Sequence, residues 1–141
     1  MKYHFKIHRE SQGFWAECVE LQGCVTQATT KNELWDNMQE ALSLYLQEPA
    51  DSEFLAALPN DKLSKKTTLV QVTVDPEVAF AFMVRYHRLK KNLTQKEAAK
   101  KMGFKSLYSY QRLEKKCNAT LEMIAKIKDI FPDFSIDLAF S

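Results

Sequence analysis

Apolar and polar residues alternate along the first positions of the chain. Tyr3, Phe5 and Ile7 recur at every second position with polar residues between them, the period of a β-strand with one solvent-exposed face. His4 and His8 fall between these apolar residues, so we expect both imidazoles to point outward with the neighbouring lysines. We assign neither histidine a chemical role.

Further strand patterns and one helical pattern follow. Residues 14–19 and 24–29 are predicted to form a second and a third strand, which follow the first in a meander. Residues 67–74 (TTLVQVTV) are rich in β-branched side chains and predict a fourth strand. Between them, residues 31–47 have apolar positions at helical spacing. The predicted buried stripe of this helix is Leu34, Met38, Ala41, Leu42 and Tyr45. A helix packed on such a sheet gives an α+β layer structure.

The apolar spacing becomes helical in the second half of the chain. Asp75 and Pro76 suit the cap and the first residue of a helix. We therefore divide the chain into a sheet-bearing domain, residues 1–74, and an all-α domain, residues 75–141.

Two short helices joined by a glycine turn are predicted within residues 92–114. Thr94 and Glu97 have the spacing of a capping box at the start of the first helix. Gly103 suits a left-handed helix terminus, and Ser106 can cap the second helix. The inward positions of that helix are Leu107, Tyr110 and Leu113. This is the plan of a helix-turn-helix, whose second helix enters the DNA major groove.

An alternating apolar pattern ends the sequence. Its members, which would share one face of a strand, are Phe134, Ile136, Leu138 and Phe140. A lone strand in a helical domain needs a pairing partner. We expect that partner to be the same strand of a second copy, in a homodimer or higher homo-oligomer. The alternative is that these side chains complete their own helical core.

Charge is distributed unevenly between the two halves. The chain has 20 Lys and Arg against 18 Asp and Glu, but residues 85–116 alone hold eleven basic and two acidic side chains. Residues 1–66 hold seven basic and ten acidic side chains. A local excess of cations is typical of a surface that contacts a phosphate backbone. A solvated lysine-rich helix surface is the alternative, and the capped helix pair favours nucleic acid.

Several other protein classes are disfavoured. No run of about 18 apolar residues occurs and no signal-peptide core is present, so we expect a cytoplasmic protein without a membrane partner. Cys18, Cys24 and Cys117 lack C-x-x-C spacing, which indicates reduced thiols and no zinc site. The predicted strands contain only Glu17 of the carboxylates that a two-metal nuclease needs. We expect no metal, no cofactor and no catalytic residues.

These patterns, in this order, resemble one protein family. Residues 13–34, GFWAECVELQGCVTQATTKNEL, resemble the N-terminal domain of HicB-type antitoxins, which has a partial RNase H-like fold. Residues 93–127, LTQKEAAKKMGFKSLYSYQRLEKKCNATLEMIAKI, resemble the Xre-like helix-turn-helix carried by one branch of that family. The resemblance implies a type II antitoxin. Its first domain would bind a HicA-type toxin, an mRNA-cleaving ribonuclease, and its second would repress its own operon.

Contacts with double-stranded operator DNA are expected on the predicted helix pair. Thr94 and Gln95 suit phosphate contacts, while Ser109 and Arg112 suit base contacts in the major groove. The expected residues at the start and outer face of the second helix are Lys105, Ser106, Tyr108, Ser109, Gln111 and Arg112. We expect Glu114 to be an intramolecular ion-pair partner instead.

The sequence suggests residues for the toxin-binding surface but does not define how they contact the toxin. Phe14, Trp15 and Glu17 are the candidates, and the sequence does not choose between pairing at a sheet edge and contact with a sheet face. Two other functions stay open. The protein could be a helix-turn-helix repressor whose N-terminal domain senses a small ligand, or an interaction protein with no DNA role.

Overall fold

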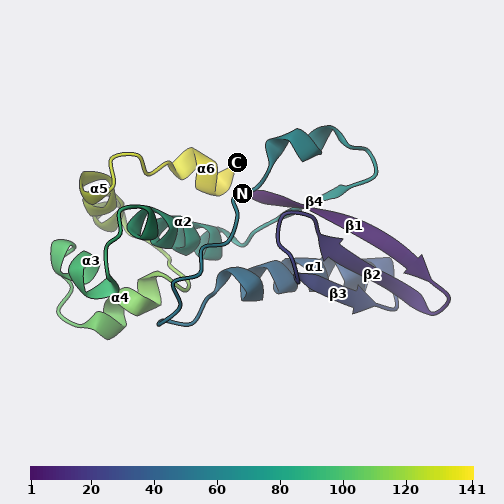
Figure 1. Ribbon diagram of the computed structural model, residues 1–141, viewed down its shortest axis with the longest axis horizontal. Coiled ribbons are helices and arrows are strands. Elements are labelled where there is room, and N and C mark those ends of the chain that lie inside the picture. Colours follow the sequence, from purple (N-terminus) through teal and green to yellow (C-terminus); the bar gives the residue numbers. More distant parts are fainter. The chain divides into compact units, whose positions relative to one another are not determined.

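The computed structural model describes all 141 residues and has an α+β fold with one antiparallel sheet and six α-helices. Two compact units are present (Figure 1). The sheet unit comprises residues 1–46 and 56–75, and the helical unit comprises residues 47–55 and 76–141. Residues 47–55 therefore group with the helices, although the sequence placed them with the sheet. Arg85 explains this grouping, because its Nη2 donates hydrogen bonds to the carbonyl oxygens of Ser52 (2.6 Å) and Phe54 (2.9 Å).

The sheet has four strands in the order β3-β2-β1-β4, and every neighbouring pair is antiparallel. The strands are β1 (Lys2–Glu10), β2 (Gly13–Cys18), β3 (Val25–Ala28) and β4 (Val70–Thr73). Gly13 has a φ of +144°, and a Cβ atom there would lie 2.5 Å from the carbonyl oxygen of Ala28. Glycine is thus required where the β1–β2 hairpin meets β3.

Helix α1 (Lys31–Leu46) covers one face of the sheet (Figure 1). Thr30 Oγ1 accepts a hydrogen bond from the Glu33 backbone N–H at 3.2 Å, so a side-chain cap starts this helix. The side chains that α1 buries are Leu34, Met38, Leu42 and Leu46. Of the predicted stripe, Ala41 and Tyr45 are only half-buried. The Tyr45 hydroxyl donates to the carbonyl oxygen of Gln22 at 3.0 Å, which ties the end of α1 to the β2–β3 turn.

His4 is buried, which contradicts the expectation that it points to solvent with His8. Only 1% of His4 is exposed, because the turn that holds Glu20 and the 3-10 helix η1 (Asp61–Lys65) cover this end of the outer sheet face. The alternation of the strand is regular, but segments distant in sequence cover one end of its polar face. His8 is half-buried and stacks on Trp15 with ring centroids 3.9 Å apart.

The helical unit contains five helices, none of which has the length and apolar content to cross a membrane. They are α2 (Pro76–Lys90), α3 (Gln95–Lys101), α4 (Leu107–Leu113), α5 (Leu121–Ile130) and α6 (Ile136–Phe140). Helix α2 is buried along most of its length. Other buried side chains of the helical unit include Tyr110, Leu113, Ile127, Phe131 and Phe134.

The predicted C-terminal dimerising strand is wrong, because residues 136–140 form the helical turn α6. Ser135 Oγ accepts a hydrogen bond from the Leu138 N–H at 3.1 Å, and this cap satisfies backbone groups that a strand would offer to a second chain. Phe134 is buried, with its ring centroid 5.2 Å from that of Phe80. Ile136, Leu138 and Phe140 are 37%, 38% and 52% exposed and do not form a buried stripe.

Candidate nucleic-acid interface

Helices α3 and α4 begin and end as the sequence predicts. Thr94 Oγ1 accepts from the Glu97 N–H at 3.1 Å, and the Glu97 carboxylate accepts from the Thr94 N–H, which completes the capping box. Gly103 has a φ of +76° in the turn. Ser106 Oγ then accepts from the Ser109 N–H at 3.2 Å and starts α4. Local hydrogen bonds therefore fix both ends of the connection.

A buried ion pair holds α4 against α2. The Arg88 guanidinium makes two contacts with the Glu114 carboxylate, through Nε to Oε1 and through Nη2 to Oε2 at 3.2 Å. Their side chains are only 5% and 2% exposed. Arg88 Nη1 also donates to the carbonyl oxygen of Leu93 at 2.8 Å, just before α3. The expected ion-pair role of Glu114 is confirmed.

Tyr110 and Gln95 complete this network. The Tyr110 hydroxyl donates to Glu114 Oε1 at 2.8 Å, and Gln95 Nε2 donates to Glu114 Oε2 at 2.9 Å. Burial and the neighbouring carboxylate raise the pKa of Tyr110, so its hydroxyl stays protonated as a donor. Three helices thus converge on one carboxylate, which fixes the direction of α4.

The amide of Gln95 faces this network, although the sequence predicted that it contacts phosphate. Gln111 Nε2 donates to Gln95 Oε1 at 3.1 Å, and both side chains are half-buried. The two amides therefore connect the start of α3 to the middle of α4. Thr94 remains exposed at the start of α3.

The outer face of α4 is polar and open to solvent. Tyr108 is 68% exposed, and the Arg112 guanidinium carbon lies 6.0 Å from the centroid of its ring. Ser109 is exposed, with its Oγ 2.8 Å from Ser106 Oγ. Lys105 is exposed in the preceding turn. Five of the eight candidate DNA contacts, Lys105, Ser106, Tyr108, Ser109 and Arg112, thus lie together.

Leu107 differs from its prediction, because 43% of it is exposed. The sequence placed it inward with Tyr110 and Leu113, of which only the latter two are buried. Leu107 is the first residue of α4, where no preceding turn covers it. It lies beside Tyr108 on the open side of the helix.

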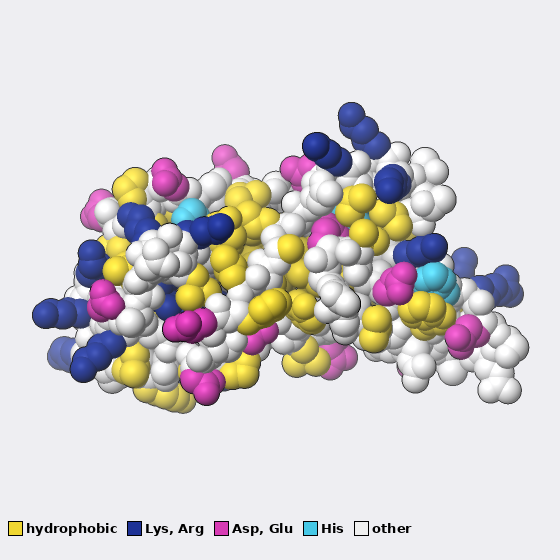
Figure 2. Space-filling model, viewed as in Figure 1, with side chains coloured by type: hydrophobic (Ala, Val, Ile, Leu, Met, Phe, Trp, Pro, Cys, Tyr) yellow, Lys and Arg dark blue, Asp and Glu magenta, His cyan; other side chains and the backbone are white.

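Not all of the cations counted in the sequence are available to a ligand. Arg85 and Arg88 are 2% and 4% exposed and bind partners inside the helical unit. The exposed cations are Lys90, Lys91, Lys96, Lys100, Lys101, Lys105, Arg112, Lys115 and Lys116. Figure 2 shows Lys and Arg side chains gathered on the left of the view, over the region where Figure 1 places α3 and α4. This cationic surface suits a polyanion.

No protein-family model matches the chain, and no curated protein matches it. A rigid, capped helix pair with polar side chains and surrounding cations can bind a phosphate backbone and present hydrogen-bonding groups to bases.

The candidate toxin contacts lie on β2, which is an inner strand of the sheet. Phe14 is on one sheet face, and Trp15 and Glu17 are on the other, because side chains alternate along a strand. Glu17 Oε1 lies 3.4 Å from His8 Nε2 beside the stacked Trp15 ring. The structure therefore separates Phe14 from the other two residues and places none of the three on an edge strand.

A polar cluster that the sequence did not predict surrounds His4. Its Nδ1 lies 2.8 Å from Glu20 Oε2, and its Nε2 lies 3.0 Å from Ser64 Oγ. Glu20 also accepts the backbone N–H groups of His4 (2.9 Å) and Asn60 (3.1 Å). We interpret this cluster as a clamp that fixes residues 60–64 on β1. These residues are far apart in sequence, so no local spacing could reveal it. No group of His, Cys, Asp and Glu side chains is placed to hold a metal ion.

Proposed function

We propose that the protein is an antitoxin of the HicB type, which binds operator DNA through α3 and α4 and neutralises a HicA-type toxin through its sheet unit. One observation carries the DNA-binding half. The polar face of α4 is exposed among cations, while the opposite face is fixed by the buried Arg88–Glu114 pair. Such support is what a helix needs to meet base edges with a defined geometry.

In this proposal α4 is the recognition helix of a helix-turn-helix. Ser109 and Arg112 contact base edges, and Arg112 can donate two hydrogen bonds to guanine O6 and N7. Thr94 and Lys105 contact phosphates on either side. Gln95 and Gln111 position the two helices, as their mutual hydrogen bond indicates.

The toxin-binding half rests on the resemblance of residues 13–34 to HicB-type antitoxins and on charge. Residues 1–66 hold more acidic than basic side chains, which suits a basic RNA-cleaving partner. A repressor with a ligand-sensing sheet unit is the competing function. It predicts a small-molecule inducer and no protein partner.

Replacing Arg112 with alanine tests the DNA-binding half. We expect Arg112→Ala to weaken binding to the upstream promoter fragment by ~1–3 kcal/mol and to relax the preference for one base pair. The measurement is a fluorescence anisotropy titration with single-base variants of the fragment. Arg9→Ala, at an exposed arginine of the sheet unit, is the matched control and should bind as the wild type does. Unchanged affinity of Arg112→Ala would remove Arg112 from the interface.

The toxin-binding half predicts that a short reading frame for a small basic protein lies beside this gene, and that protein is the probe of the test. Co-expression of the full chain should restore growth to cells that produce that protein, and the two proteins should co-purify. Arg112→Ala should restore growth equally well, because it changes only DNA binding. A folded full chain that neither restores growth nor co-purifies would favour the ligand-sensing repressor.

A further inference from the structure

Strand β3 leaves one edge of the sheet open. The Cys18 N–H donates to the Cys24 carbonyl at 2.9 Å, so residue 24 faces β2. Backbone groups alternate in direction along a strand, so residues 26 and 28 also face β2, whereas Val25 and Gln27 face the open edge. Asn37 Nδ2, from α1, donates to the Gln27 carbonyl at 2.9 Å. This amide occupies the position that a backbone N–H of an added strand would take.

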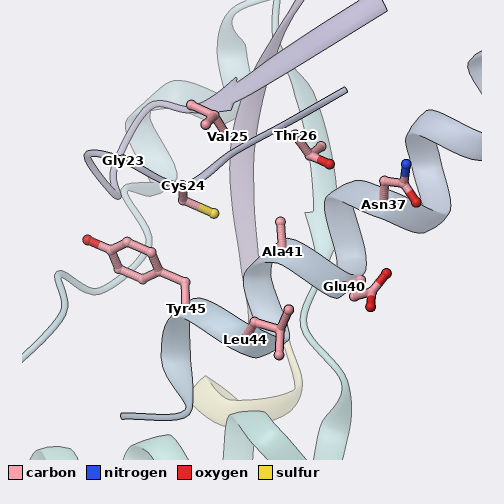
Figure 3. A pocket seen from close by; sticks show the side chains of 9 residues that line it. All are labelled: Gly23, Cys24, Val25, Thr26, Asn37, Glu40, Ala41, Leu44 and Tyr45. Carbon is pink, nitrogen blue, oxygen red and sulfur yellow. The ribbon is translucent and has the colours of Figure 1, made fainter. Parts of the chain in front are cut away.

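Two hollows follow this edge from end to end. The larger, of about 580 Å³, lies between residues 23–26 and α1 (Figure 3). Ala41 and Tyr45 extend toward the strand in Figure 3, and Leu44 lies at the outer rim. Leu44 is 67% exposed, and Val25 on the strand is 56% exposed. The second hollow, of about 380 Å³, continues past Gln27 to Thr29 at the tip of the β1–β2 hairpin.

The charge along both hollows has one sign. Glu40 lines the first hollow, and Glu10 and Glu33 line the second, whereas no Lys or Arg lines either. Arg9 and Lys31 lie 6.0 and 5.9 Å from the centroid of the Phe14 ring, which lines the second hollow at the hairpin end. The edge therefore combines outward backbone groups of Val25, the outward Gln27 N–H, exposed apolar side chains and spaced carboxylates.

We propose that the β3 edge binds an extended, basic segment of the toxin as a fifth strand of the sheet. Main-chain hydrogen bonds to the Val25 backbone groups and to the outward Gln27 N–H supply the register, while Asn37 keeps the Gln27 carbonyl. Lysine or arginine side chains of the segment meet Glu40 and Glu33, and apolar ones pack on Leu44. This inference rests on the proposed function for the identity of the partner, and it chooses edge pairing over contact with a sheet face.

The decisive variant is Gln27→Pro. Proline removes the outward N–H and blocks an added strand, yet it is tolerated on the free side of an edge strand. Thr73→Pro is the matched control on the opposite edge strand. The Val74 N–H pairs with the Met1 carbonyl, so by the same alternation Thr73 faces away from β1. Glu40→Lys reverses a charge that lines the first hollow. Its matched control is Asp36→Lys, which reverses a charge on α1 outside both hollows.

Each full-length variant is titrated with the small basic protein from the neighbouring reading frame. A second probe is a fluorescein-labelled eight-residue peptide of alternating lysine and valine, compared with its glutamate–valine counterpart. We expect Gln27→Pro and Glu40→Lys to lose about tenfold or more in affinity for both basic probes. Thr73→Pro and Asp36→Lys should bind as the wild type does. Circular dichroism and a cooperative urea transition establish that each variant is folded.

The outcomes separate this inference from the proposed function. If the wild type binds the toxin and both Gln27→Pro and Glu40→Lys bind it equally well, the edge site is overturned. The antitoxin function then remains intact. Absence of toxin binding by the wild type overturns the toxin-binding function, and the lysine–valine peptide then decides whether the edge is a binding site. A wild-type dimer that Gln27→Pro converts to a monomer overturns the proposal by showing a second copy on β3.

Discussion

Glu114→Ala is expected to lower the free energy of unfolding of the helical unit by ~3–5 kcal/mol. The substitution leaves the Arg88 guanidinium buried without its carboxylate, and an uncompensated buried charge carries a cost of this size. It also removes the acceptor shared by Tyr110 and Gln95. Urea titration followed by circular dichroism measures the loss. Because total stabilities are about 5–15 kcal/mol, the expected loss is a large share of the whole.

Glu122→Ala is the matched control, because the Glu122 side chain is 84% exposed and makes only an i,i+4 pair with Lys126. Its removal should change stability by less than about 1 kcal/mol. A double variant, Arg88→Met with Glu114→Leu, should recover part of the loss, since it removes both charges together. Equal effects of Glu114→Ala and Glu122→Ala would show that the buried pair does not hold α4.

Affinity for the promoter fragment is expected to fall roughly 10²- to 10³-fold between 50 and 200 mM salt. We expect about four to six of the exposed cations around α3 and α4 to contact phosphates, which gives a slope of log K against log salt of about −4 to −5. Replacing Lys100 and Lys101 by glutamine should make the slope shallower by up to about 2. Anisotropy titrations at four salt concentrations measure it.

The matched control replaces Lys62 and Lys65, which are exposed lysines of the sheet unit, by glutamine. This variant should keep the wild-type slope, because the proposed interface lies in the helical unit. A slope near zero for the wild type, or equal changes in both double variants, would contradict a phosphate interface on α3 and α4.

Local signals predicted most of the elements and their ends. The caps Thr94 and Ser106 act within three residues of themselves, so their spacing in the sequence was sufficient. Pro76 begins α2 for the same reason. The C-terminal segment shows the limit of apolar periodicity. Its alternation predicted a strand, but the Ser135 cap and packing of the segment on α2 produced a helical turn.

Contacts between residues distant in sequence determined the features that local patterns did not predict. Arg85 and Arg88 counted toward a cationic stretch, yet both are buried by contacts with residues more than twenty positions away. His4 alternated correctly with its neighbours and was still buried, by Glu20 and Ser64. The order of the strands, and with it the open edge of β3, also depends on pairing between distant segments. The outer face of α4 was predicted better, because helical spacing alone separates Ser109 and Arg112 from Tyr110 and Leu113.

The most direct test of the central claim is a competition titration of the full chain with two DNA fragments. One is the promoter fragment upstream of the gene, and the other is a scrambled fragment of the same length and composition. At about 150 mM salt, we expect the promoter fragment to bind roughly 10³-fold more tightly or better. Equal affinity for the two fragments, or no complex with either, would contradict the account.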